Sequence, residues 1–259
     1  MTKNSEIIQK ENAVATYDDA MMGSWGTTNE FDSSDIIIPK IMLMQGSSQL
    51  VNDGIAKPGD YLHSVNKEIL GSTKDPVTFT PVHMTKKWRV TKKDGNDYKF
   101  SHYEDVNASN IGNDKEFMIG NIPSQRQLCY NFYVLIKGWA VPFILQMKGI
   151  SHGAGKQLAN EMFLVNSVEK LPPAGKNFIL LVEDIDFDNK KYKGYKVKTN
   201  EVNEKNYVMG TCLEWYKTIT AGEVKEDTTE EFEGKKTVRN AGPPPNDAPH
   251  PADSDTIPY

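Results

Sequence analysis

The sequence has few of the residues on which metal sites, thiol chemistry and disulfide frameworks depend. Its 259 residues include only two cysteines, and its five histidines are scattered without the spacing of metal ligands. Cys129 and Cys212 both lie in apolar segments, which favours buried free thiols over a disulfide. No catalytic constellation emerges from these residues. We therefore expect a protein that is not an enzyme and that binds no metal or cofactor.

Long hydrophobic runs are also absent. No stretch approaches the roughly 18 consecutive apolar residues that a membrane-spanning helix needs. The first residues contain neither an apolar stretch nor a charged leader of the kind found in secretory signals. A soluble, intracellular protein in a reducing compartment is expected.

Charge is divided unevenly along the chain, so that the net charge of −5 conceals a basic middle. Residues 1–35 contain seven acids and two bases, and residues 222–259 contain nine acids and four bases. Residues 36–221 therefore hold 24 of the 30 bases and 19 of the 35 acids. This asymmetry predicts an acidic flexible arm over 1–33, a folded basic body over 34–221 and a disordered, acidic, proline-rich tail over 222–259. A polyanion is the partner that such a body would attract.

The stretch from Gln127 to Lys198 gives the clearest indication of the fold. Dense aromatic and β-branched residues predict strands at 128–136, 142–147, 178–182 and 190–198. Between them, apolar residues at helical spacing predict a helix that Ser151 caps and that ends before Pro172. Strands, one helix and further strands are the element order of a small Greek-key barrel. We expect a mainly β body with one or two helices, in an elaborated OB-fold-like Greek-key barrel.

Other elements are less densely marked. Further strands are expected at 41–45, 61–65 and 77–91, and a helix at 207–219. The aromatic and β-branched content of that last segment also permits a strand. Pro81 should mark a sheet edge or a bulge. Residues 98–123 are polar and rich in Asn and Gly, so they are expected to form a long loop or flap.

Two predicted strands interleave cations with aromatic rings. The first, within 77–91 and just beyond it, carries Lys86, Lys87, Trp88, Arg89, Lys92 and Lys93. The second carries Lys191, Tyr192, Lys193, Tyr195 and Lys196, and we expect a bulge at Gly194 that turns both rings to one face. Cations neutralise phosphates and aromatic faces stack unpaired bases, which is the combination that single-stranded nucleic acid requires. The structural alternative is a solvated edge strand whose Trp faces the core.

A glycine-rich helix start at Gly153-Ala154-Gly155-Lys156 invites comparison with phosphate-binding loops. A P-loop requires G-x-x-x-x-G-K followed by Ser or Thr, but Gly149 is one residue too far from Gly155, and Gln157 replaces the hydroxyl. The spacing therefore favours a helix start at which Lys156 lies near a nucleic-acid phosphate.

The C-terminal residues carry the most specific pattern. Asp253, Asp255, Ile257, Pro258 and Tyr259 resemble the tip of bacterial single-stranded DNA-binding proteins, in which aspartates precede an Ile-Pro-Phe terminus. Here Tyr replaces the final Phe, and Ser and Thr interrupt the acids. The resemblance implies that the terminal ring enters an apolar pocket on a partner, where a basic residue holds the α-carboxylate and a basic rim meets the acids.

A basic β body with an acidic, aromatic-ended tail resembles in its organisation the single-stranded DNA-binding proteins of bacteriophages, whose bodies elaborate an OB-fold. The resemblance implies a protein that coats single-stranded DNA in the cytoplasm of the infected bacterial host. Its tail would recruit replication, recombination or transcription proteins. Two alternatives remain open: a phage virion structural or cargo protein whose basic body contacts the genome, and a nucleotide-binding enzyme that uses Gly153 to Lys156.

Overall fold

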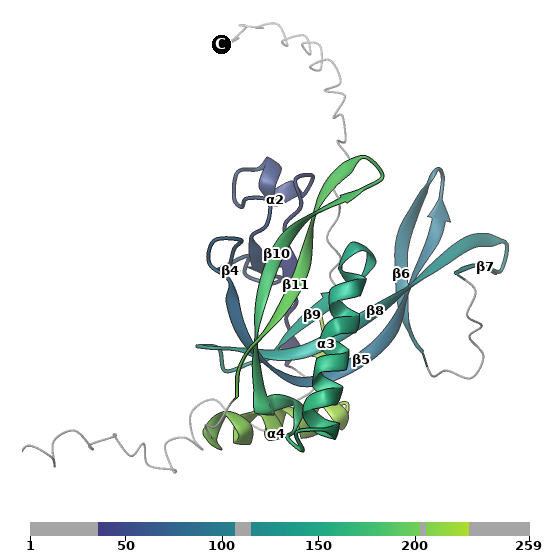
Figure 1. The fold of residues 1–259 in the computed structure, drawn as a ribbon. Coiled ribbons are helices and arrows are strands. Elements are labelled where there is room, and N and C mark those ends of the chain that lie inside the picture. The colour runs from purple at the N-terminus through teal and green to yellow at the C-terminus, as the bar shows by residue number, and fades with distance from the viewer. Residues whose placement is uncertain (1–35, 107–114, 203–205, 228–259) are drawn as a thin grey trace, which may run out of the picture.

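The computed structural model describes residues 36–106, 115–202 and 206–227 (Figure 1). The expected N-terminal arm, most of the expected tail and the C-terminal tip, with Asp253, Asp255, Ile257, Pro258 and Tyr259, lie outside the described residues.

The described chain is mainly β, as the sequence predicts. Its strands are β1 Ile37–Ile38, β2 Ile41–Leu43, β3 Tyr61–His63, β4 Ile69–Gly71, β5 Val77–Asp94, β6 Asp97–Asp105, β7 Glu116–Ile119, β8 Ile122–Ile136, β9 Phe143–Met147, β10 Lys176–Phe187, β11 Lys190–Val202 and β12 Lys225–Glu226. Its helices are α2 Gln49–Asn52, α3 His152–Ser167 and α4 Asn206–Thr220, with 3-10 turns η2 Gly149–Ser151 and η3 Pro173–Gly175.

The long strands β5 and β8 form the centre of a seven-stranded antiparallel sheet. At one end, which we call the barrel end, β5 also pairs with β10 and β8 pairs with β9. At the other end β5 pairs with β6, and β8 pairs with β7. We call this second end, residues 86–105 and 115–128, the wing; in Figure 1 it projects away from the barrel end.

The barrel end follows the strand and helix order expected of an OB-fold-like barrel, although its main sheet does not close. It consists of β11-β10-β5-β8-β9, and α3 lies in the connection between β9 and β10. Within the described part of the chain, the gap between β9 and β11 is spanned by the segment around β2. The Ile144 N–H donates to Pro39 O at 2.7 Å, and the Tyr195 hydroxyl donates to Ile41 O at 3.2 Å.

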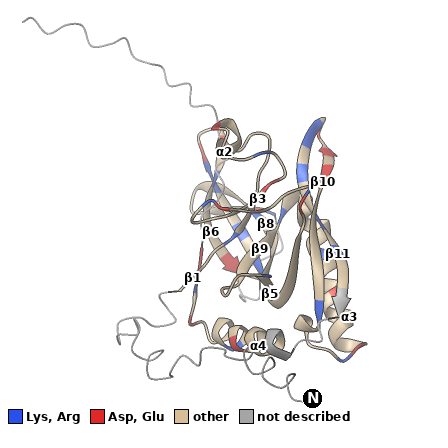
Figure 2. Ribbon diagram, turned by 90° about the vertical axis from the view of Figure 1, so that its left-hand side faces the viewer, with Lys and Arg blue, Asp and Glu red and all other residues tan. Residues whose placement is uncertain are grey.

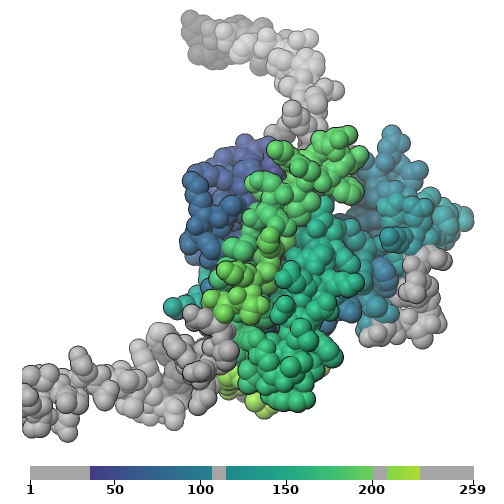
Figure 3. Space-filling view, in the orientation of Figure 1, coloured from purple at the N-terminus to yellow at the C-terminus, as the bar shows by residue number. Residues whose placement is uncertain are grey.

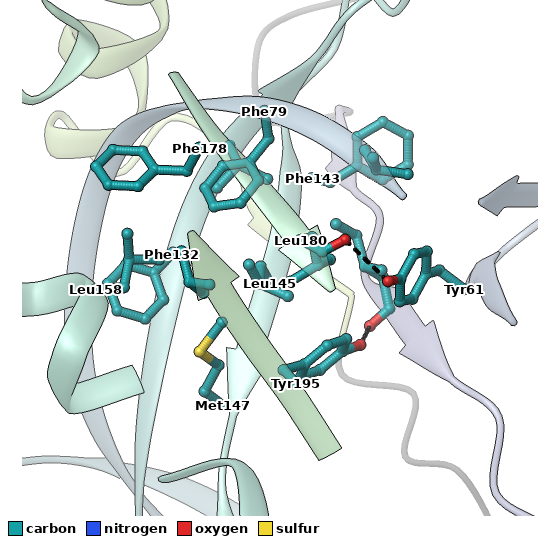
Figure 4. Close-up of a cluster of buried hydrophobic side chains, with 14 of the residues drawn as sticks. Tyr61, Phe79, Phe132, Phe143, Leu145, Met147, Leu158, Phe178, Leu180 and Tyr195 are labelled. Carbon is teal, nitrogen blue, oxygen red and sulfur yellow. Dashed lines mark hydrogen bonds between the residues drawn. The ribbon is translucent and has the colours of Figure 1, made fainter. Parts of the chain in front are cut away.

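The core of the barrel end is built from alternate residues of each strand, since successive side chains point to opposite faces. Its buried members include Phe79, Phe132, Val134, Phe143, Leu145, Met147, Phe178, Leu180, Tyr195 and Val197. Leu158 of α3, labelled in Figure 4, joins the same cluster, as does Met162. The Tyr61 hydroxyl donates to Leu180 O at 2.9 Å, so that its buried polar atom is satisfied.

Gly155, near the start of α3, serves packing. A Cβ on buried Gly155 would lie 2.9 Å from the Met147 Cβ and 3.0 Å from the Tyr130 ring, closer than van der Waals contact allows. The expectation that Ser151 caps α3 is wrong, because its side chain makes no cap hydrogen bond. Instead its Oγ accepts from the Tyr195 N–H at 3.0 Å, which ties the start of α3 to β11.

The helix expected at 207–219 is present as α4, and it packs on the opposite face of the sheet from α3. Its Cys212 and Ile219 are buried together with Tyr133 and other side chains of β5, β8 and β9. Cys129 and Cys212 are both buried free thiols, as expected. The register of β5 against β8 shifts between Pro81 and His83, which confirms the expected bulge.

Two sequence expectations are corrected by strand pairing. The loop expected over 98–123 contains β6 and β7, which pair with β5 and β8, respectively. The body also continues beyond residue 221, because β12 pairs in parallel with β1 and Asp227 is buried. The neighbouring strands β5 and β8 supply the hydrogen bonds of β6 and β7, whereas β1, distant in sequence, supplies those of β12.

Candidate nucleic-acid interface

The basic stretch of β5 is divided between the two faces of the wing. The register with β8 is unbroken from Lys86 to Lys92, so alternate side chains point to opposite sides. Lys86, Trp88 and Lys92 share what we call the inner face, and Lys87, Arg89 and Lys93 share the outer face. The structure therefore does not bring these six residues to one surface.

The inner face of the wing leads directly to the start of α3. The Lys86 Nζ lies 5.4 Å from the centroid of the Tyr130 ring, within cation-π range. The Tyr130 ring in turn lies 5.2 Å from the ring of His152, the first residue of α3. Half-buried Trp88 pairs with Leu128 on this face, and exposed Lys156 follows one turn into α3.

The second basic strand, β11, forms a regular hairpin with β10. The register runs without a shift from the pair Phe178 and Thr199 to the pair Phe187 and Lys190, so the bulge expected at Gly194 is absent. A Cβ on Gly194 would lie 2.2 Å from the Ile185 Cδ1, so a larger residue here would require the Ile185 side chain to move.

Regular pairing places Tyr192 and Tyr195 on opposite faces of the hairpin. Tyr195 is only 5% exposed, its ring stacks on Tyr61 with centroids 6.2 Å apart, and it belongs to the core. The expectation that Tyr195 stacks on bases is therefore wrong. Its alternation with buried Val197 was the sequence signal for this orientation.

Tyr192 lies on the face of the hairpin that meets the start of α3. It pairs with Ile185, and Phe187, which is 62% exposed at the hairpin tip, lies on the same face. Gly194 on this face lies close to Ser151. In the space-filling view the hairpin and the wing flank α3, and the surface is open between their upper parts (Figure 3). We call the inner face of the wing, the start of α3 and this face of the hairpin tip the candidate interface.

Several of the expected phosphate-binding lysines are paired with acids inside the protein. Lys193 contacts Asp184 at 2.7 Å, Lys196 contacts Glu183 at 3.0 Å, and Lys87 contacts Glu226 at 2.6 Å. The hydrogen bond from Lys193 holds the pKa of Asp184 below its ordinary value. In Figure 2 the ribbon of the β10–β11 hairpin is coloured for basic and for acidic residues close together.

Five other expected lysines form no ion pair with a described residue, although Lys191 interacts electrostatically with Asp184. Across the described ranges, ion pairs are absent at Lys86, Lys92, Lys93, Lys156 and Lys191. Three of these five lie on β5 in the wing, one on α3 and one at the hairpin. Of these five, Lys86 and Lys92 lie on the inner face of the wing and Lys156 lies on α3, whereas Lys93 and Lys191 point to the opposite faces of their hairpins.

The outer face of the wing contains a hollow that the sequence did not indicate. Its volume is about 570 Å³, and it is lined by Lys87, Phe100, Ser101, His102, Tyr103, Val224, Lys225 and Glu226. The rings of Phe100 and Tyr103 lie 5.0 Å apart, and the Arg89 guanidinium carbon lies 5.4 Å from the Phe100 centroid. These aromatic residues escaped notice because β6 was expected to be a loop.

Glu226 joins β12 to the sheet through two hydrogen bonds. Its carboxylate accepts from Lys87 and from the Tyr133 hydroxyl. Burial is the main reason that the pKa of Tyr133 is raised above its ordinary value, and the negative charge of Glu226 raises it further.

Burial alone raises the pKa of the Cys212 thiol to about 11, so this thiol is protonated at neutral pH.

The described residues contain no group of three or more His, Cys, Asp or Glu side chains placed to hold a metal ion. Of the helices in the same residues, none has the length and apolar character required to cross a membrane.

Comparison with known proteins gives one family. Neither a curated protein nor a solved structure matches the chain. Residues 8–225 match the family described as Pam3 phage gp34-like protein, so the match covers most of the chain, including both basic strands and the two long helices. The chain therefore belongs to the Pam3 phage gp34-like protein family.

Proposed function

We propose that this phage-family protein binds single-stranded DNA at the candidate interface. The observation that carries the proposal is the placement of two basic-aromatic hairpins, about a hundred residues apart in sequence, on either side of the start of α3. The inner face of the wing supplies Lys86, Trp88 and Lys92, and the β10–β11 tip supplies Tyr192 and Phe187.

The position of these hairpins in the fold supports the proposal. OB-folds bind oligonucleotides on the face of their second and third strands, with the loops that join strands 1 to 2 and 4 to 5. If β5 is taken as the first strand of the barrel end, then β6 and β7 lie in the first of these connections. The β10–β11 turn is then the second.

The side-chain chemistry also fits a single strand better than a duplex. Stacking of unpaired bases on aromatic rings is worth about 1 to 3 kcal/mol per base and does not depend on sequence. Lysines without internal partners can replace the counterions of phosphates. A duplex keeps its bases stacked on one another, so Trp88 and Phe187 would have no ring to bind.

We also propose that the C-terminal residues recruit replication, recombination or transcription proteins. The aspartates and the Ile257-Pro258-Tyr259 end are the basis for this part of the proposal. Deletion of Tyr259 alone should weaken capture of such partners while the affinity for single strands hardly changes, because the aspartates remain. Unchanged capture of a purified host partner would exclude the terminal ring as its anchor.

A virion structural or cargo protein is the second candidate. The internal pairing of Lys87, Lys193 and Lys196 favours it, because these lysines then serve the stability of the protein and not a polyanion. Such a protein would contact packaged genome without preference for unpaired bases.

The experiment that separates the two is a titration of the full chain with labelled oligo-dT and with a duplex of equal length, at two salt concentrations. Single-strand binding well above duplex binding, weakened by salt and accompanied by quenching of tryptophan fluorescence, is expected from the proposed function. Equal affinity for the two nucleic acids, or no binding, would contradict it.

A further inference from the structure

The hollow on the outer face of the wing is a second surface that combines rings with cations. Trp88 and Lys86 point to the opposite face of the same strand, so the hollow is separate from the candidate interface. β6 forms one wall and the segment around β12 forms the other, so that the two walls are more than a hundred residues apart in sequence.

We propose that this hollow binds one nucleotide of a single strand that continues from the candidate interface across the edge of the wing. The proposal rests on the proposed function and names a further contact of the same ligand. In the described part of the sheet, β6 pairs with β5 alone, which makes it the edge strand over which a nucleic acid can pass.

The two rings in the hollow provide a preformed surface for a base. Phe100 and Tyr103 are half-buried and inclined by 50° to each other. The Tyr103 hydroxyl donates to Gln146 at 3.2 Å, which fixes its ring, and Arg89 lies against Phe100. A ring already held in place loses little conformational entropy when a base packs on it.

The charges around the rings suit a phosphate. Lys225 is exposed on β12, and its main chain is fixed by pairing with Ile37. The only carboxylate in the lining, Glu226, accepts hydrogen bonds from Lys87 and Tyr133, so its charge is directed towards the protein. Lys225 is then the cation best placed to meet a phosphate that enters the hollow.

The test compares two variants of the full chain, Phe100→Ala and Lys225→Ala, with two controls. Tyr98→Ala removes a ring from the same strand outside the hollow, and Lys137→Ala removes an exposed charge from the turn after β8. Each protein is titrated with a short and a long oligo-dT, chosen within the range of about 4 to 16 nucleotides that OB-folds cover. Thermal melting of each variant checks the fold, and Lys225→Ala removes no buried packing.

Both hollow variants should bind the long oligonucleotide about five-fold or more weakly than the controls and bind the short one equally well. Equal affinity of variants and controls for both lengths would overturn the inference while the proposed function stands. An equal loss of affinity for the short and the long oligonucleotide would overturn the inference that the hollow is a contact site separate from the candidate interface. If the unaltered protein binds neither oligonucleotide, the proposed function itself has failed. If free thymidine monophosphate is instead the ligand of the hollow, its binding will be saturable and will require Lys225. If this is observed and the variants show no loss that depends on oligonucleotide length, the proposed path of the nucleic-acid strand through the hollow is overturned.

Discussion

The two ends of β5 and β8 differ in what surrounds them, although the strands run through both without interruption. At the barrel end, every residue of β8 from Asn131 to Ile136 is buried, between the core on one side and α4 on the other. In the wing, residues of the same strand such as Gln127 and Ile122 are exposed. Only the first environment fixes side chains by packing on both faces.

Under the proposed function, one pair of strands serves stability at the barrel end and binding in the wing. The packed barrel end holds β5 and β8 in place, and the strands continue into the wing, where Lys86, Lys93 and Gln127 are exposed although Val90 and Ser124 are buried. A binding surface on strands is positioned more accurately than one on a free loop. The comparison predicts that substitutions at the barrel end act on stability and that substitutions in the wing act on nucleic-acid binding.

The largest effect is expected for Phe132→Ala at the barrel end. Phe132 is completely buried and stacks on Tyr130, so its removal should destabilise the protein by about 3 to 5 kcal/mol. Urea denaturation of Phe132→Ala and of Leu128→Ala, a half-buried residue of the same strand in the wing, measures the contrast. Equal losses of unfolding free energy at the two positions would contradict the distinction between the barrel end and the wing.

Trp88→Ala is the corresponding change in the wing. It should weaken oligo-dT binding by about 1 to 3 kcal/mol and reduce stability much less than Phe132→Ala does, because Trp88 is only half-buried. A variant that retains Trp88 as its sole tryptophan should show fluorescence quenching by oligo-dT. A core-sized loss of stability without any loss of affinity would place Trp88 among the structural residues instead.

Alkaline pH should destabilise the barrel end. Burial raises the pKa of Tyr61 and Tyr133 above the ordinary value of about 10, so each ring stays neutral in the folded state at a pH where it ionises in the unfolded state. Their contribution is fully present below about pH 10 and is lost as pH rises further, by up to about 1.4 kcal/mol per pH unit for each group. Denaturant midpoints measured across this range should fall, and less steeply in Tyr133→Phe; an unchanged slope in that variant would contradict the assignment.

The smallest effect concerns the paired lysines of the hairpin. Asp184→Asn removes the exposed acid that contacts Lys193, and this frees a charge on the hairpin, on the face opposite Tyr192. Binding of oligo-dT should become slightly tighter, by less than the loss caused by Trp88→Ala, and the gain should disappear at high salt. Glu169→Gln, which removes an acid paired with Lys176 at the end of the hairpin far from its tip, is the matched control. Weaker binding by Asp184→Asn would show that the ion pair helps to shape the interface.

The strands with buried faces could be predicted from sequence, whereas the wing could be predicted only in part. The run at 128–136 is dense in apolar residues because the fold buries it on both sides, and this density is visible without a structure. β6 has no such signal, since Asp97–Asp105 alternates polar and aromatic residues and is held by hydrogen bonds to β5. Its two hollow-lining rings were therefore missed.

Side-chain direction and contacts between residues distant in sequence account for the remaining differences between the structure expected from the sequence and the structure observed. Tyr195 could have been assigned to the core, because it alternates with Val197 while Tyr192 does not. The contact of Glu226 with Lys87 could not have been found, because the two residues are 139 positions apart and meet through a parallel pairing of two very short strands. Short elements of this kind carry no pattern long enough to detect.

The salt dependence of oligo-dT binding tests the central claim most directly. The wing lysines Lys86, Lys92 and Lys93 have no acidic partner among the described residues, whereas Lys193 and Lys196 are paired. Replacing the three wing lysines by alanine should reduce the slope of log K against log salt by about 2, since each phosphate contact with a single strand contributes about 0.7. Replacing Lys193 and Lys196 should change the slope much less. A slope that is unchanged by the wing substitutions would contradict the assignment of the wing as the nucleic-acid-binding end of the two strands.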